Sequence, residues 1–178
     1  MNLVLIGYRG TGKTTVARRV ARELNWESID SDVEVERRAG KSIAQLFADA
    51  GEGAFRDLES AVLADFVTRE RIVFATGGGV VGRAENCRLL GQAGLIVWLT
   101  ARVETILARL DTDATTAGRR PNLLSGGEAE VRKLLAERTP LYESCAAAAI
   151  ATDDRSPEAV AADVLAVVQA RLCAPEGE

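Results

Sequence analysis

Residues 7–14 read Gly-Tyr-Arg-Gly-Thr-Gly-Lys-Thr, and this stretch, called the phosphate loop below, constrains the fold more than any other feature. It fits the pattern G-x-x-x-x-G-K-[ST], whose glycines let backbone N–H groups turn toward a phosphate. An apolar run at 3–6 precedes it, and residues 15–24 have helical spacing. A strand, a glycine-rich loop and a helix in this order predict a nucleotide-phosphate site at a helix N-terminus. A glycine-rich turn that matches by chance is the alternative.

The length and composition of the chain fit one globular domain. Its 178 residues, 47% of them apolar, can bury a full core but leave no room for a second large domain. We expect one domain over residues 1–172 and a short flexible tail at 173–178. A net charge of −4 argues against a nucleic-acid partner, and no apolar run reaches the length of a membrane span. We therefore expect small-molecule partners, with no nucleic acid and no membrane, and we also expect a monomer.

Cysteine and histidine usage narrows the chemistry. Cys87, Cys145 and Cys173 are odd in number and widely spaced, so they indicate neither a disulfide framework nor a zinc site. A reducing cytoplasm is the inferred location. The chain has no histidine, which excludes the commonest general base and histidine-ligated metals. Any proton transfer must use a carboxylate or water.

The alternation of apolar runs with helical patterns predicts the architecture. Short apolar runs recur at 3–6, 72–75, 95–99 and 147–151, and residues 26–29 form a fifth candidate strand. Helical patterns lie between them. The fold class is therefore α/β, with a parallel sheet of about five strands and helices on both of its faces.

Three patterns predict individual helices. Apolar residues at offsets of three and four form a buried stripe on a helix that begins at Gly53: Phe55, Leu58, Val62 and Phe66. Ser42 and Gln45 fit a capping box, and Ser156 before Pro157 fits the start of the last helix. That helix has valines along one face: Val160, Val164, Val167 and Val168.

The segment 111–127 differs from the rest. It has little apolar periodicity, and Arg119 and Arg120 stand side by side before Pro121. A long polar segment inside a compact phosphotransferase is typical of a mobile lid, and a plain surface loop is the simpler alternative. We expect the lid, because the phosphate loop already predicts a phosphate site.

Residues after the predicted strands separate the classes of phosphate-loop proteins. Thr76 and Thr100 follow two strands where motor and transport ATPases have a carboxylate, and no asparagine precedes a lysine as in guanine-specific switch proteins. Asp30 and Asp32 follow the second strand, at the sheet edge where α/β proteins bind ligands. One could support Mg²⁺ and the other orient a substrate hydroxyl. A helix N-cap is the alternative.

Glycines and arginines suggest an anionic acceptor. A run of three glycines, residues 77–79, follows the third strand, where backbone without side chains lets a small ligand approach. Arg56 follows the core position Phe55, and Arg138 precedes Thr139 and Pro140 at a predicted helix end. Each arginine alone could be solvated. Together with the glycines they suggest a carboxylate, which a guanidinium grips with two hydrogen bonds.

The ordered motifs resemble those of the shikimate kinase family, a group of small-molecule kinases with the phosphate loop, over about residues 2–172. The resemblance rests on the phosphate loop, Asp30-Ser31-Asp32, the nine residues from Gly51 to Glu59, Thr76-Gly77-Gly78-Gly79, Arg120-Pro121, and Arg138-Thr139-Pro140-Leu141-Tyr142. It implies a Mg²⁺-dependent transfer of the ATP γ-phosphoryl group to the 3-hydroxyl of shikimate, a step toward chorismate and the aromatic amino acids.

The resemblance also implies roles on the ATP side. The residues expected to bind the phosphates of ATP are Gly10, Thr11, Gly12, Lys13, Thr14 and Thr15. Thr14 would ligate Mg²⁺, and Asp30 would act on the metal through water. Arg120 would swing from the lid onto the transferring phosphate, and Lys13 would share that role. Adenine contacts would come from Arg109 and Arg155.

On the acceptor side, Asp32 would hold the shikimate hydroxyls and act as the base. Arg56 and Arg138 would clamp the carboxylate over a floor made by three glycines: Gly77, Gly78 and Gly79. The lid departs from the family pattern R-P-L-L, because it reads Arg120-Pro121-Asn122-Leu123 and carries the extra cation Arg119. Either arginine could meet the phosphate.

Two rival functions remain open on the sequence. A gluconate or nucleoside-monophosphate kinase would share the phosphate loop and the lid. A nucleotide-binding regulatory protein without turnover would share only the loop. An intact set of five site residues counts against such a decayed site: Lys13, Thr14, Asp30, Asp32 and Arg120.

Overall fold

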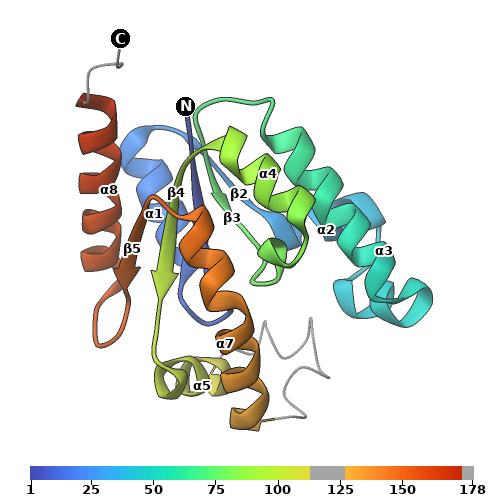
Figure 1. Cartoon of the computed structure of the whole chain (residues 1–178). Helices are drawn as coiled ribbons and strands as arrows, with labels where there is room; N and C mark the ends of the chain where they lie inside the picture. The colour runs from blue at the N-terminus through green and yellow to red at the C-terminus, as the bar shows by residue number, and fades with distance from the viewer. Residues whose placement is uncertain (113–126, 174–178) are drawn as a thin grey trace.

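The computed structural model describes residues 1–112 and 127–173. Its centre is a five-stranded sheet in which every neighbouring pair of strands is parallel, in the order β2-β3-β1-β4-β5 (Figure 1). The strands are β1 (Asn2–Ile6), β2 (Glu27–Asp30), β3 (Ile72–Ala75), β4 (Gly94–Thr100) and β5 (Ala148–Ala151). The predicted α/β class and the five strands are confirmed, with boundaries displaced by a residue or so.

Helices connect the strands and cover both faces of the sheet. They are α1 (Lys13–Leu24), α2 (Ser31–Ala39), α3 (Ile43–Phe66), α4 (Ala84–Ala93), α5 (Val103–Thr112), α7 (Gly127–Cys145) and α8 (Pro157–Cys173), with a 3₁₀ turn η1 (Val80–Gly82) before α4. α1 and α8 pack on one face, and α3, α4 and α7 pack on the other (Figure 1). The described helices include none with the length and apolar content that crossing a membrane requires.

The core follows the alternation of side chains along each strand. In β1, Leu3 and Leu5 face α1 and α8, whereas Val4 and Ile6 face the other helices. Strand β3 divides in the same way, because successive side chains of a strand point to opposite faces. Both faces are buried, which explains why these strands read as continuous apolar runs.

Helix α3 confirms two sequence signals at once. Ser42 and Gln45 form the predicted capping box at its start. A kink at Gly51, whose φ of 77° is unusual for any residue with a side chain, divides the helix before Gly53. The predicted stripe then faces the core: Phe55, Val62 and Phe66 are buried, and Leu58 is partly buried against them.

Helix α7 corrects one expectation. Pro140 was predicted to mark a helix end, but α7 continues through it to Cys145. Tyr142 explains the difference, because it is fully buried beyond the proline and anchors the last turn to the core. Tertiary packing here outweighs the backbone hydrogen bond that proline cannot donate.

The polar segment 111–127 lies mostly outside the described residues. Asp111 and Thr112 are the last residues of α5, and Gly127 begins α7. The expected lid, Arg119 and Arg120 fall in the interval between them. At the C-terminus, α8 ends at Cys173, the first residue of the expected tail, and three of its four predicted core valines are buried: Val160, Val164 and Val168. Val167 is partly buried against the same cluster.

Candidate active site

The phosphate loop joins β1 to α1 at the carboxyl edge of the sheet. Gly10 and Gly12 have φ values of 77° and 85°, in the left-handed region that favours glycine, and Gly12 is the N-cap of α1. The buried Thr11 hydroxyl donates a 2.8 Å hydrogen bond to the Tyr8 carbonyl, which fixes the turn of the loop. Thr15 is exposed in the first turn of α1. The N-terminus of α1 therefore opens on the loop, an arrangement suited to a phosphate.

Lys13 lies inside the phosphate loop. Its side chain is buried, and its ammonium donates hydrogen bonds of 2.9 Å to the Gly7 carbonyl and 2.7 Å to the Tyr8 carbonyl. These bonds hold a positive charge at the loop, where a phosphate would need it.

Thr14 and Asp30 form the contact between the phosphate loop and β2. The Thr14 hydroxyl donates a 2.6 Å hydrogen bond to Oδ2 of Asp30. The other oxygen, Oδ1, caps α2 by accepting from the backbone N–H groups of Asp32 and Val33. The N-cap considered as an alternative is thus present, and it leaves Oδ2 for the threonine.

This oxygen pair fits Mg²⁺. The described residues contain no cluster of three or more acidic, cysteine or histidine side chains that could enclose a metal. Mg²⁺ does not need such a cage, because it binds through one or two protein oxygens and completes its shell with phosphate oxygens and water. A threonine hydroxyl held against one carboxylate at the end of a phosphate loop supplies that kind of donor set.

Gly77 lies against two carboxylates. Its N–H donates a 2.7 Å hydrogen bond to the buried Ser31 hydroxyl, which ties the end of β3 to the start of α2. A Cβ placed on Gly77 would lie 2.7 Å from Oε1 of Glu59 and 3.1 Å from Oδ1 of Asp32. A side chain at this position would force Glu59 to shift and would crowd Asp32, which favours glycine here.

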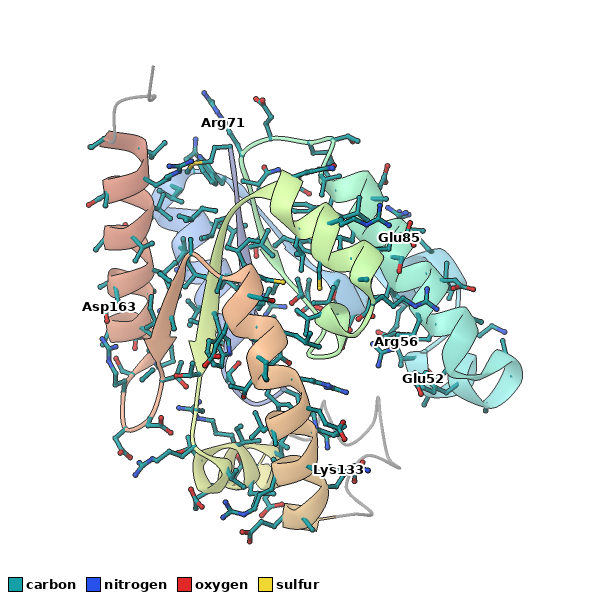
Figure 2. All side chains as sticks on the ribbon, in the orientation of Figure 1. Glu52, Arg56, Arg71, Glu85, Lys133 and Asp163 are labelled. Atoms are coloured by element: carbon teal, nitrogen blue, oxygen red, sulfur yellow. The ribbon has the colours of Figure 1, made fainter. Side chains whose placement is uncertain are left out.

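Arg56 is held in place by two glutamates of its own helix. Its Nη1 donates a 2.7 Å hydrogen bond to Oε2 of the buried Glu59, and its Nη2 donates a 3.0 Å bond to Glu52. Figure 2 shows Arg56 and Glu52 together on α3. Burial disfavours the charged guanidinium, but Glu59 and Glu52 outweigh it and raise the pKa of Arg56. A Cβ on Gly79 would lie 2.5 Å from Nη1 of Arg56, so the cation packs on this glycine.

Arg138 reaches the same glycines from α7. Its Nη1 donates a 3.1 Å hydrogen bond to the Gly78 carbonyl, and the Tyr142 hydroxyl donates to the same oxygen. Burial raises the pKa of Tyr142 to about 12, which keeps this phenol protonated as a donor. The Arg138 guanidinium also lies 5.8 Å from the centre of the Tyr8 ring.

The glycine run touches the phosphate loop directly. A Cβ on Gly78 would lie 3.1 Å from the Arg9 backbone nitrogen and 3.3 Å from the Gly7 carbonyl oxygen. The loop that suits a phosphate and the glycines that pack against Arg56 and Arg138 are therefore adjacent parts of one site.

The arginines expected near adenine have different surroundings. Arg109 donates from Nη1 to the Gly10 carbonyl at 3.1 Å and from Nη2 to the Thr152 carbonyl at 2.6 Å, so it bridges the phosphate loop and the end of β5. Arg155 hydrogen-bonds within its own turn and forms a 2.7 Å ion pair with Asp163 of α8. Arg109 therefore contacts the phosphate loop, whereas Arg155 contacts α8.

Sequence reasoning gave no role to three residues that shape the site: Ser31, Glu59 and Tyr142. Glu59 had a detectable signal, because it lies four residues after Phe55 and three before Val62, on the apolar stripe of α3. A charged residue on a buried face needs a partner, and Arg56 is that partner.

Comparisons with known proteins show the family to which the chain belongs. A family model described as shikimate kinase matches residues 9–169. A shikimate kinase of Nitratidesulfovibrio vulgaris is 49% identical over 80% of this chain and 81% of its own, and one of Rhodopirellula baltica is 41% identical over 92% and 88%. The solved shikimate kinase of Acinetobacter baumannii in complex with shikimate superposes with a TM-score of 0.89 at 37% identity, over 97% of this chain and 95% of its own.

Proposed function

Because this chain belongs to the shikimate kinase family, we propose that it is the enzyme that transfers the γ-phosphoryl group of ATP to the 3-hydroxyl of shikimate. The products are shikimate 3-phosphate and ADP, and the step serves chorismate and aromatic amino acid synthesis. A solved relative in complex with shikimate, 37% identical, supports this acceptor.

One observation of the structure carries the proposal. Arg56 from α3 and Arg138 from α7 converge on Gly78 and Gly79, and those glycines lie against the phosphate loop. Two guanidinium groups on a bare backbone floor suit a small carboxylate, which accepts paired hydrogen bonds from arginine. Asp32 adjoins the same floor at Gly77. A polyol that carries a carboxylate matches both sets of groups, because its carboxylate suits the two arginines and its hydroxyl groups suit Asp32.

On the donor side, the phosphate loop binds the ATP phosphates through its backbone and Lys13. Thr14 would ligate Mg²⁺ and Asp30 would act on the metal through water, and the bound metal would neutralise charge on the phosphate oxygens. Lys13 Nζ lies at the loop on the Gly7 and Tyr8 carbonyls, where its positive charge would stabilise the transferring group. Arg109, bonded to Gly10, supports the loop beside the nucleotide. Arg120 of the lid is assigned to the transferring phosphate, and Arg155 to adenine, by the family motif alone.

On the acceptor side, Asp32 orients the substrate hydroxyl and accepts its proton. Its position at the start of α2 is set by the N–H that it donates to Asp30, and its carboxylate adjoins Gly77. Phosphoryl transfer needs little covalent chemistry from the protein, so positioning of this hydroxyl together with stabilisation of the charge on the phosphate supplies most of the rate enhancement.

We also propose that the chain acts as a monomer in the cytoplasm. Its exposed large apolar side chains among the described residues are scattered over the fold: Met1, Val33, Leu141 and Leu172. Scattered single residues do not form the contiguous patch of a large interface. All three cysteines are free thiols, which suits a reducing compartment. Light scattering of the purified chain tests the monomer.

A coupled assay of ADP release tests the activity. Shikimate, gluconate and nucleoside monophosphates are offered as acceptors with Mg²⁺ and ATP, together with a shikimate analogue whose carboxylate is reduced to an alcohol. We expect turnover with shikimate and a much higher KM with the analogue, because Arg56 and Arg138 lose their anionic partner. Preference for gluconate or a nucleotide would replace the proposed acceptor, and equal background rates with all acceptors would indicate a binding protein.

A further inference from the structure

The buried hydroxyl of Thr152 lies between two groups of opposite hydrogen-bonding character. Thr152 follows β5 directly. Its hydroxyl donates a 3.0 Å hydrogen bond to the carbonyl of Thr100, the last residue of β4, and accepts a 2.9 Å bond from Nη1 of Arg109 in α5. A carbonyl only accepts and a guanidinium only donates, whereas a hydroxyl does both from one atom. A small side chain with a hydroxyl is therefore the kind that this position needs.

Thr152 binds Arg109 at two points. Its backbone carbonyl accepts a 2.6 Å hydrogen bond from Nη2 of Arg109, in addition to the bond that its hydroxyl accepts from Nη1. Two bonds to different nitrogens of a planar guanidinium fix the direction of that group. The Thr100 carbonyl also accepts a 2.9 Å bond from the Thr152 backbone N–H, so it keeps a partner without the hydroxyl. The distinct contribution of the hydroxyl is to hold Arg109.

Arg109 in turn holds the phosphate loop. Its Nη1 donates a 3.1 Å hydrogen bond to the Gly10 carbonyl. The N–H of the same peptide unit belongs to Thr11, points the opposite way and donates a 3.4 Å bond to the Tyr8 carbonyl. Helix α5 packs on this turn, since a Cβ on Gly10 would lie 3.4 Å from the Ile106 carbonyl oxygen. The peptide unit is thus held at both ends, just before the N-terminus of α1.

We propose that Thr152 is a positioning residue for nucleotide binding, because its hydroxyl fixes Arg109 and Arg109 fixes the turn of the phosphate loop at Gly10. The inference rests on the proposed function, since it concerns the ATP side of that site. Without the hydroxyl, Arg109 keeps its bond to the Thr152 carbonyl but can rotate about it. The loop is then ordered when the nucleotide binds rather than beforehand, which lowers the affinity.

The acceptor side should not depend on this network. Arg138 is bonded to the Gly78 carbonyl, and Arg56 is held by Glu59 beside Gly79. None of these contacts involves Thr152 or Arg109. A change in nucleotide affinity without a change in shikimate affinity therefore distinguishes positioning of the loop from a general loss of structure.

Calorimetric titration of the full-length protein with ADP and with shikimate measures the two sides separately. Thr152→Val keeps the shape of the side chain and removes the hydroxyl. We expect the Kd for ADP to rise about tenfold, because a hydrogen bond from a charged donor is lost, and the Kd for shikimate to change less than about twofold. The KM for ATP should rise with the Kd for ADP. Thr152→Ser keeps the hydroxyl and should restore ADP affinity, whereas Thr152→Ala should repeat the loss.

Thr68→Val is the matched control, because it removes an exposed hydroxyl bonded to the Asp65 carbonyl after α3, and it should bind ADP as wild type does. A double-mutant cycle tests the route through Arg109. In an Arg109→Met protein, Thr152→Val should have no further effect on ADP affinity. An undiminished effect there would overturn the proposal. Unchanged ADP affinity in Thr152→Val would overturn it too, and so would equal losses of ADP and shikimate affinity.

These outcomes are separate from the identity of the acceptor. A wild-type chain that binds ADP but phosphorylates another acceptor would overturn the proposed function, and the ADP affinities of the variants would still decide the role of Thr152. A wild-type chain that does not bind ADP would overturn both.

Discussion

The carboxylate of Glu59, which is only 2% exposed, accepts a 2.7 Å hydrogen bond from Nη1 of Arg56. This pair lies beneath the glycine floor, and it fixes the direction in which Arg56 presents its guanidinium. Burying the Glu59 carboxylate without the Arg56 cation would destabilise the fold, and so would burying the Arg56 cation without the Glu59 carboxylate. The site therefore depends on a residue that need not touch the substrate.

Glu59→Gln should lower the free energy of unfolding by about 1–3 kcal/mol, because a charged hydrogen bond becomes a neutral one in a buried setting. Urea denaturation measures the change. Glu52→Gln is the matched control on the same arginine. Glu52 is mostly exposed, so its loss should cost under about 1 kcal/mol. Equal losses in the two variants would show that burial does not strengthen the Glu59 pair.

Gly79→Ala should impair shikimate binding more than folding. The new Cβ would lie 2.5 Å from Arg56, whose guanidinium cannot move away freely because Glu59 holds it. We expect the KM for shikimate to rise about tenfold, equal to about 1.4 kcal/mol, with the KM for ATP nearly unchanged. Gly82→Ala, where nothing lies within 4 Å, should behave as wild type. An unchanged shikimate KM in Gly79→Ala would contradict the floor assignment.

Asp30 has two roles that substitutions can separate. Asp30→Asn keeps a good N-cap for α2, so the free energy of unfolding should stay close to that of wild type. The same change removes the charge beside Thr14, so the Mg²⁺ concentration for half-maximal rate should rise about 10–100-fold. Asp30→Ala should raise this Mg²⁺ concentration by a similar factor, and because it also removes the N-cap it should lower the free energy of unfolding by about 1 kcal/mol. Magnesium titrations and urea denaturation measure the two effects. Wild-type magnesium dependence in Asp30→Asn would rule out the metal role.

Asp32→Asn should reduce kcat by about 10²–10⁴-fold, because it removes the acid proposed to take the hydroxyl proton. ATP binding should stay close to that of wild type, since the phosphate loop is untouched. Steady-state rates and calorimetric ATP titration measure the two quantities. Asp49→Asn, which alters an exposed carboxylate paired with Lys41, serves as the control. Near-normal turnover in Asp32→Asn would refute the role of this residue.

Glu34 should contribute a pH-dependent part of the stability. Hydrogen bonds from Arg37 and then Arg38 lower its pKa from 4.5 to about 2. A lowered pKa in the folded state means that the contribution is complete above pH 4.5 and is lost as the pH falls toward 2. Glu34→Gln should therefore cost up to about 1 kcal/mol at pH 7 and progressively less below pH 4.5. Urea denaturation of wild type and Glu34→Gln from pH 7 downward measures this difference in stability. A difference that does not shrink below pH 4.5 would contradict the prediction.

Local patterns predicted most of the elements. The capping box at Ser42, the stripe from Phe55 to Phe66 and the proline start of α8 all depend on neighbours within a few residues, and each is present. The helix end predicted at Pro140 was wrong, because the burial of Tyr142 depends on contacts far away in the chain. The burial of Glu59 was missed for a related reason. The position of Glu59 on the apolar stripe could be read from the sequence, but its contact with Arg56 could not.

The phosphate loop was determined by the sequence alone, because Gly10, Gly12 and Lys13 act within one turn of chain whose conformation depends on backbone freedom and the start of α1. The acceptor site was decided by the tertiary structure. Arg56 and Arg138 belong to separate helices, and they converge on Gly78 and Gly79 only because α3 and α7 pack on the same face of the sheet. Motifs name such residues, whereas packing over long chain separations sets the distances between them.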